Sequence, residues 1–170
     1  MKTRQKDRNS PGPGAPWNEI RPNLWMGGHD WTDTSGEVRF AVVTDQFDLV
    51  ISLYTRAGSG PDPGVEHRVA EVPDGPLGAD QIDQVRRMAV VAADAVRDGR
   101  PTLVRCHSGY NRSGLVVAQA LIELGMDSAA AIALIRRQRS PRALNNQVFV
   151  DYLDAGLDIA YLLTGLDSPA

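Results

Sequence analysis

The strongest constraint in the sequence is a buried-type strand that runs into a glycine-containing loop and then into a helix. The apolar run Thr102–Cys106 (TLVRC) predicts the strand, and a helix over about 112–124 follows the loop and stops at Gly125. Gly109 lets the loop adopt backbone conformations that other residues resist. This arrangement predicts a sheet with a loop and a packed helix at the end of one strand.

Apolar runs predict three further strands, and helical periodicity predicts three further helices. The strands are expected at Leu24–Met26, Asp48–Leu53 and His67–Val72. The helices are expected over about 80–98, from Asp127 or Ser128 to before Pro141, and from near Asn146. Because strands separated by helices favour parallel pairing, we predict an α/β fold with a mostly parallel central sheet of about four to five strands flanked by helices.

Composition sets limits on the class of protein. A chain of 170 residues, 42% of them apolar, suits one compact domain. Residues 1–16 are polar and basic and end in a Pro- and Gly-rich run, so we expect a flexible tail there and a single domain over 17–170. A net charge of −3 does not favour nucleic-acid binding. No apolar run suits a membrane span or a secretory signal, so we expect a cytoplasmic protein.

The loop from Cys106 to Arg112 (CHSGYNR) has the composition of an anion site. Where a loop opens into a helix, the first backbone N–H groups have no partner within the helix and can converge on an anion. Their positive field favours a cysteine thiolate, and Arg112 offers a planar fork for two phosphate oxygens. The plainer interpretation is a buried Cys106 and a surface Arg112. The added Gly109 and Ser113, between a strand and a helix, favour nucleophilic attack on a phosphate monoester.

The motif CHSGYNRS, or Cys-x5-Arg-Ser, resembles the signature of the protein tyrosine phosphatase superfamily, with the spacing of its dual-specificity branch. The resemblance covers most of residues 17–163. The segment Ile20–Gly27 is similar to the opening strand of those domains, and Asn146-x-x-Phe149 to the start of their last helix. The resemblance implies a hydrolase that forms a phosphocysteine at Cys106 without metal or cofactor.

The resemblance also assigns roles around the nucleophile. Arg112 would hold the phosphoryl oxygens, and Ser113 would stabilise the departing thiolate. The rest of the phosphate-binding loop would be His107, Ser108, Gly109, Tyr110 and Asn111.

Family members also use a carboxylic acid to protonate the leaving oxygen, in a loop roughly thirty residues before the cysteine. Asp74 lies 32 residues before Cys106 and directly after a predicted strand, which makes it the candidate proton donor. An Asp-Gly pair is also a common turn. Asp80 is the second candidate, although it suits the role of a helix cap better.

The sequence departs from the family pattern at the residue before the nucleophile. That residue is commonly a histidine that orients the cysteine, but here it is Arg105, and His107 follows the cysteine instead. Arg105 could favour the thiolate by its charge, or it could be a strand-end residue that reaches solvent. We interpret His29 and His67 as ordinary surface or strand residues.

The substrate and the function class leave alternatives open. The loop contains no lysine, so a protein carrying phosphotyrosine or phosphoserine/threonine fits better than a phosphoinositide. A small phosphorylated metabolite or an RNA end remains an alternative substrate. A phosphate-binding pseudophosphatase would usually lack the Cys or the Arg. A Cys–His hydrolase would need a histidine placed as a base, and His107 is merely adjacent to Cys106 in sequence. The sequence does not determine the oligomeric state.

Overall fold

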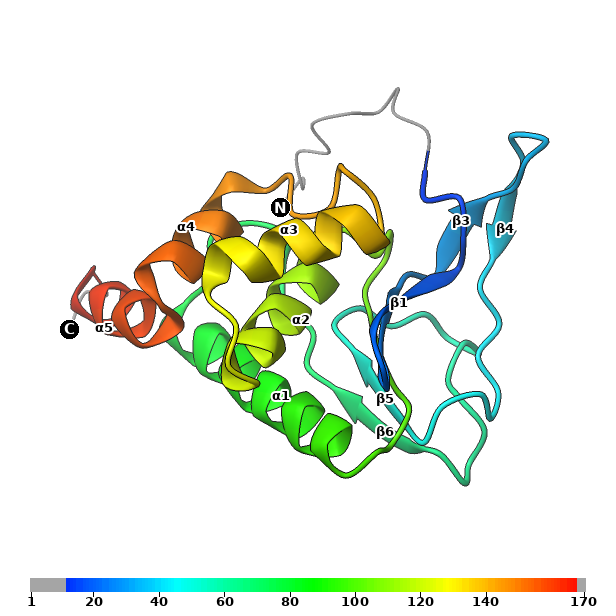
Figure 1. The fold of residues 1–170 in the computed structure, drawn as a ribbon, viewed down its shortest axis with the longest axis horizontal. Helices are drawn as coiled ribbons and strands as arrows, with labels where there is room; N and C mark the ends of the chain where they lie inside the picture. The colour runs from blue at the N-terminus through cyan, green and yellow to red at the C-terminus, as the bar shows by residue number, and fades with distance from the viewer. Residues whose placement is uncertain (1–11, 168–170) are drawn as a thin grey trace.

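A mostly parallel sheet and a layer of helices make up residues 12–167, the part of the chain that the computed structural model describes (Figure 1). The sheet has five strands in the order β1-β2-β7-β5-β6. Strand β1 is antiparallel to β2, and the other pairings are parallel. The strands are β1 (Trp17–Arg21), β2 (Leu24–Gly27), β5 (Leu49–Ser52), β6 (Glu66–Val69) and β7 (Thr102–Arg105). The predicted fold class is therefore confirmed.

The helices follow the expected pattern up to the last one. They are α1 (Ala79–Arg97), α2 (Arg112–Glu123), α3 (Ser128–Gln138), α4 (Gln147–Ala155) and α5 (Leu157–Asp167). The side chain of Asp127, and not Ser128, caps α3 by accepting a hydrogen bond from a backbone N–H. Asn146 caps α4 in the same way. Gly156 ends α4 with a φ of +93°, and α5 is a further helix that the periodicity did not predict.

Three short strands were missed by sequence reasoning. The segment Ile20–Gly27 was expected to be a single opening strand. Instead it contains a turn between the end of β1 and β2, which pair in antiparallel orientation. A second, two-stranded sheet consists of β3 (Asp30–Thr32) and β4 (Val38–Phe40), which project at the opposite end of the molecule from α5 (Figure 1). The expected strand His67–Val72 ends earlier, because the chain leaves the regular ladder after Val69.

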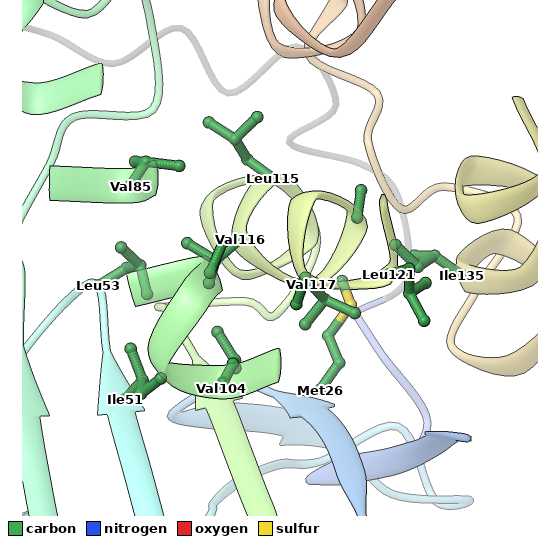
Figure 2. Close-up of a cluster of buried hydrophobic side chains, with 14 of the residues drawn as sticks. Met26, Ile51, Leu53, Val85, Val104, Leu115, Val116, Val117, Leu121 and Ile135 are labelled. Atoms are coloured by element: carbon green, nitrogen blue, oxygen red, sulfur yellow. The ribbon is translucent and has the colours of Figure 1, made fainter. Parts of the chain in front are cut away.

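The helices bury one face of the sheet in an apolar core (Figure 2). Side chains from β2, β5 and β7 point toward α2 and α1, among them Met26, Ile51 and Val104. They meet Val116 and Leu121 of α2, which are fully buried. Burial of each such side chain contributes about 1.5–3 kcal/mol. This packing fixes α2 against the sheet, with its N-terminus directly after the loop that begins at Cys106.

The other face of the sheet is covered by irregular chain instead of a helix. A small cluster there contains Val43, Phe47, Val50 and Leu103. The rings of Trp17 and Trp25 meet Phe47 edge-on, at centroid distances of 5.3 and 5.9 Å. The segment between β4 and β5 therefore closes this face.

The expected N-terminal tail, residues 1–16, lies mostly outside the described residues. Its described part is hydrogen-bonded to the domain. The N–H of Thr32 donates to the carbonyl of Pro13 (2.8 Å), and the N–H of Gly28 donates to that of Pro16 (3.2 Å). Contacts with the domain therefore begin before residue 17. None of the helices between residues 12 and 167 has the length and apolar character needed to cross a bilayer.

Candidate active site

The chemistry-bearing residues meet at the carboxyl edge of the parallel strands. In the register of the sheet, Arg105 at the end of β7 lies between Gly27 of β2 and Ser52 of β5. The residues that follow these three strands are therefore neighbours, including Cys106 and His29. Ligands of parallel α/β sheets bind beyond this edge.

Every backbone carbonyl from Cys106 to Asn111 accepts a hydrogen bond from outside the loop. The donors are His29 Nδ1 to Cys106 (2.9 Å), His29 N to His107 (2.7 Å), Arg139 Nη2 to Ser108 (3.2 Å), Arg139 Nε to Gly109 (3.2 Å), Leu144 N to Tyr110 (2.9 Å) and Leu115 N to Asn111 (2.8 Å). The backbone of the loop is thus held from its outer side by three separate parts of the chain and by α2.

These hydrogen bonds to the carbonyl groups also set the direction of the N–H on the opposite side of each peptide group. In a trans peptide the C=O and the following N–H point in opposite directions. The N–H groups of residues 107–112 therefore face away from the donors that hold the carbonyls. Within residues 12–167 none of these six N–H groups has a hydrogen-bond acceptor. Convergent free donors beside a helix N-terminus form an anion site. We call the loop Cys106–Arg112 the cradle.

Gly109 is required by the geometry of the cradle. Its φ is +74°, a left-handed conformation that favours glycine. A Cβ atom at this position would lie 2.6 Å from both the carbonyl oxygen of Gly27 and Nη2 of Arg139. The expected role of Gly109 in a tight loop is therefore supported by both its conformation and its surroundings.

Arg139 supports the cradle, and sequence reasoning missed it. Its guanidinium is buried, and Nη1 also donates to the carbonyl of Ala15 and to Oδ1 of Asn18, both at 2.8 Å. Burial lowers the pKa of Arg139 to about 10, so the group stays charged at neutral pH. Because it lies 30 residues after Gly109, no local pattern links it to the loop.

The structure places Ser113 beside Cys106, and Arg112 begins the helix that follows the cradle. Cys106 is 2% exposed, and its Sγ lies 3.3 Å from Oγ of Ser113. Nη1 of Arg112 donates to the carbonyl of Val72 at 3.3 Å, and its guanidinium lies 5.5 Å from the ring centroid of Tyr54. Nε of Arg112 is buried and has no described partner, so this guanidinium keeps an unused donor.

Asp74 is joined to the cradle by side-chain amides. Its Oδ2 accepts from Nδ2 of Asn111 (3.1 Å), and its Oδ1 accepts from Nδ2 of Asn146 (2.7 Å). Asp80 lies in the first turn of α1 and is exposed. The N-cap of α1 is Gly78, so the expected capping role of Asp80 is wrong. Of the two candidate acids, Asp74 is the one that contacts the cradle.

Arg105 does not reach solvent, which corrects one of the two interpretations of this residue. Its side chain is 1% exposed and lies on the face of the sheet opposite Val104 and Cys106, because neighbouring strand residues alternate. Nε donates to Oγ of Ser52 (3.0 Å), and Nη2 donates to the carbonyl of Ser59 (2.7 Å). Burial lowers the pKa of Arg105 to about 10.

His29 is also buried, with 1% of its surface exposed, so its interpretation as an ordinary surface or strand residue is wrong. Burial, with smaller effects of the charges of Arg105, Arg56 and His107, lowers the pKa of His29 to about 4 against an opposing hydrogen bond with the Cys106 carbonyl. His67 is exposed, as expected, and its Nε2 lies 2.8 Å from Oγ of Ser52.

A charged and aromatic rim borders the cradle at His107. Its Nε2 lies 3.3 Å from Oδ2 of Asp30, and Arg56 binds the same carboxylate through both terminal nitrogens at 2.9 and 3.1 Å. The ring of Tyr54 meets His29 and His107 edge-on, each at 5.1 Å. Burial lowers the pKa of His107, and Asp30 opposes this shift.

A separate pocket of about 660 Å³ lies at the opposite end of the parallel strands, beside their amino ends. It is lined by residues that precede or begin β5, β6 and β7, such as Asp48, Glu66 and Arg100. Asp45 and Asp62 add two more carboxylates to its wall. Because this concentration of negative charge repels phosphate, the cradle is the better phosphate site.

The fold is that of the tyrosine and dual-specificity phosphatases. The crystal structure of human DUSP28 matches with a TM-score of 0.66 and 22% identity, over 88% of this chain and 99% of that one. A mouse putative dual specificity phosphatase matches with a TM-score of 0.65 and 23% identity, over 92% and 96%. The tyrosine phosphatase OH1 from Orf virus matches with a TM-score of 0.60 and 16% identity, over 87% and 91%. No protein-family model and no curated protein sequence matches the chain.

The buried neutral His29 predicts a specific loss of stability in mild acid. Between pH 6.5 and 4 the unfolded chain binds a proton at this residue that the folded chain does not, so the free energy of unfolding falls as the pH falls. His29→Asn removes the titration. Between pH 7 and 5 the wild type should lose about 2 kcal/mol more than the variant, as measured by urea unfolding. Equal losses would show that His29 titrates normally in the folded protein.

Proposed function

We propose that this chain is a phosphomonoester hydrolase that uses Cys106 as its nucleophile and forms a phosphocysteine intermediate. The cradle supports this function most directly, because its six N–H donors, which have no acceptor among residues 12–167, follow the cysteine and face away from the contacts that hold the loop. Arg112, whose Nε has no partner in the described part of the chain, adds positive charge at the N-terminus of α2. A dianionic phosphate fits such donors without a metal ion.

In the first step the thiolate of Cys106 attacks the phosphorus atom. A P–S bond forms while the P–O bond to the leaving group breaks, and the electron pair of that bond moves to the leaving oxygen. Asp74 would protonate this oxygen, since its hydrogen bonds to Asn111 and Asn146 keep its carboxyl group beside the cradle. The cradle N–H groups and Arg112 stabilise the charge on the phosphoryl oxygens.

In the second step water attacks the phosphocysteine, and the P–S bond breaks to release phosphate and the thiolate. The hydroxyl of Ser113 lies 3.3 Å from Sγ of Cys106, within reach for a hydrogen bond to sulfur. Donation of that hydrogen bond to the departing thiolate lowers the barrier to this step. Asp74, deprotonated in the first step, would accept a proton from the attacking water.

A phosphorylated protein is the substrate class that we propose. The structural neighbours named as tyrosine or dual-specificity phosphatases support it, as does the absence of lysine from the cradle. The Tyr54 ring beside Arg112 and His107 gives the rim an aromatic surface that suits a phosphotyrosine ring. A small phosphorylated metabolite is the alternative, which a substrate panel would separate from phosphopeptides.

The geometry does not favour a Cys–His hydrolase. The ring nitrogens of His107 lie near Oγ of Ser108 (3.4 Å) and Oδ2 of Asp30 (3.3 Å), and neither is bonded to Cys106. The partner of Sγ is Ser113. A general base for the thiol would need a hydrogen bond to the sulfur, and His107 makes none among the described residues.

The nucleophile is tested by turnover of p-nitrophenyl phosphate in EDTA, with inhibition by vanadate. Cys106→Ser should abolish turnover, because the serine hydroxyl is a much poorer nucleophile at neutral pH. Tungstate should still bind the variant, because the cradle N–H groups and Arg112 remain. Turnover of the variant at more than a few per cent of wild type would remove Cys106 from this role.

Arg112→Lys tests the guanidinium. The substitution keeps the positive charge but loses the planar pair of donors. We expect a loss of about 2–4 kcal/mol in transition-state stabilisation, calculated from kcat/KM for p-nitrophenyl phosphate. Arg137→Lys, on the exposed side of α3, is the matched control and should leave kcat/KM unchanged. Activity of Arg112→Lys near that of wild type would mean that Arg112 does not hold the phosphoryl group.

Asp74→Asn tests the proton donor with a change that keeps the shape of the side chain. Phosphotyrosine should be hydrolysed about 100- to 10,000-fold more slowly, because its leaving oxygen needs a proton as the P–O bond breaks. A substrate with a very acidic leaving group should lose less. The basic limb of the pH–rate profile should flatten. Rates measured across a series of aryl phosphates give all three results.

Asp80→Asn is the control for the proton donor, since Asp80 lies in the first turn of α1. It should change neither the leaving-group dependence nor the pH profile. The reverse result, with the leaving-group effect in Asp80→Asn alone, would assign the acid to Asp80. A leaving-group effect in neither variant would mean that Asp74 is not the proton donor.

A further inference from the structure

His29 holds two consecutive peptide groups of the cradle. Its side-chain Nδ1 lies 2.9 Å from the carbonyl oxygen of Cys106, and its backbone N–H donates to the carbonyl oxygen of His107 at 2.7 Å. A carbonyl oxygen can only accept, so Nδ1 carries the hydrogen and donates it. The peptide group that follows the nucleophile is therefore fixed by a side chain.

The orientation of this peptide group matters for charge. With the carbonyl of Cys106 bonded to His29, the N–H of His107 points the opposite way. If the peptide group turned over, its carbonyl oxygen would face the cradle in place of an N–H. A negative dipole end would then lie where the thiolate and phosphate carry negative charge. The hydrogen bond from Nδ1 selects the orientation that attracts an anion.

The surroundings of His29 keep its ring in place and neutral. Its backbone carbonyl accepts from the N–H of Ala41 at 2.8 Å, and its ring meets Tyr54 edge-on at 5.1 Å. The side chain is 1% exposed, and burial disfavours the charged imidazolium. The positive charges of Arg105 and Arg56, and that of His107 when it is protonated, act in the same direction. The ring therefore donates through Nδ1 as a neutral imidazole.

The other ring nitrogen shows that packing alone does not explain this histidine. Nε2 of His29 is buried and has no hydrogen-bond partner among residues 12–167. A buried acceptor without a partner destabilises the folded state, and an apolar side chain of similar size would avoid this cost. What the imidazole adds at this position is the donor on Nδ1.

We propose that His29 is a positioning residue for the phosphatase reaction, whose Nδ1–H keeps the peptide group between Cys106 and His107 turned so that its N–H binds the phosphate. This inference rests on the proposed function. Arg105, which directly precedes the nucleophile, cannot take this part because its guanidinium lies on the opposite face of the sheet and binds Ser52 and Ser59. His29 acts through the backbone and does not touch the substrate.

Two variants of similar size separate the donor from the packing. His29→Asn branches at Cγ as histidine does and places an amide donor near the position of Nδ1. His29→Leu has the same branching and no donor. We expect His29→Asn to retain kcat within about threefold of wild type and His29→Leu to lose about 10- to 100-fold, because a preorganised donor is no longer held in place.

Stability should not follow activity in this pair. Both variants remove the unpartnered Nε2. His29→Asn leaves a buried amide oxygen without a partner and His29→Leu leaves the Cys106 carbonyl without its donor, so their melting temperatures should be similar. The slower variant would then be no less stable than the faster one. Equal kcat values for the two variants would overturn the proposal, and so would a loss in His29→Leu that is matched by a fall in its melting temperature.

A measurement without turnover distinguishes this proposal from the proposed function. Cys106 is the one cysteine of the chain, so iodoacetamide reports on it alone. The pH midpoint of alkylation should move to higher pH in His29→Leu and stay in place in His29→Asn. An unchanged midpoint in His29→Leu would overturn the role of His29 even if the wild type is a phosphatase. A shifted midpoint with no turnover by wild type would overturn the proposed function alone.

Discussion

The hydrogen bonds that hold the carbonyls of the cradle outward are the interaction on which the candidate site depends. The local sequence of a six-peptide loop does not by itself make all of its N–H groups point to one side. Here the direction is set from outside, by His29, Arg139, Leu144 and α2. The anion site is therefore a property of the whole fold, although the residues that would bind the anion are consecutive in the chain.

The parts of the structure that follow from local sequence were predicted well. The strand, loop and helix over 102–123 agree with the apolar pattern to within a residue or two, because each element contains its own periodicity and its own stop signal. Asp74 was named from the family resemblance, by its distance along the chain from Cys106, and it lies against Asn111 of the cradle. The cap of α3 was one of the two residues named, Asp127, and α4 begins next to Asn146 as expected.

The parts that depend on distant segments were not predictable in this way. Strands β3 and β4 have three residues each, too few to show a period. Arg139 and His29 look like ordinary charged or polar residues in sequence, and only the fold brings them to the outer side of the loop. A charged residue at the end of a strand, such as Arg105, usually reaches solvent. Here its side chain is buried on the far face of the sheet, where it donates hydrogen bonds to the Ser52 hydroxyl and the Ser59 carbonyl.

The bonds from Arg139 to Ala15 and Asn18 connect residues more than 120 positions apart in the chain. During synthesis the cysteine, the arginine of the loop and α2 all emerge before Arg139 does. A nascent chain that ends before α3 is complete would contain the nucleophile without the support that orients its phosphate donors. Contacts at such a separation form late in folding, because long loops must close first. The phosphate donors of the cradle would then be oriented only in the final stage of folding, after the N-terminal segment has bound Arg139 at the end of α3.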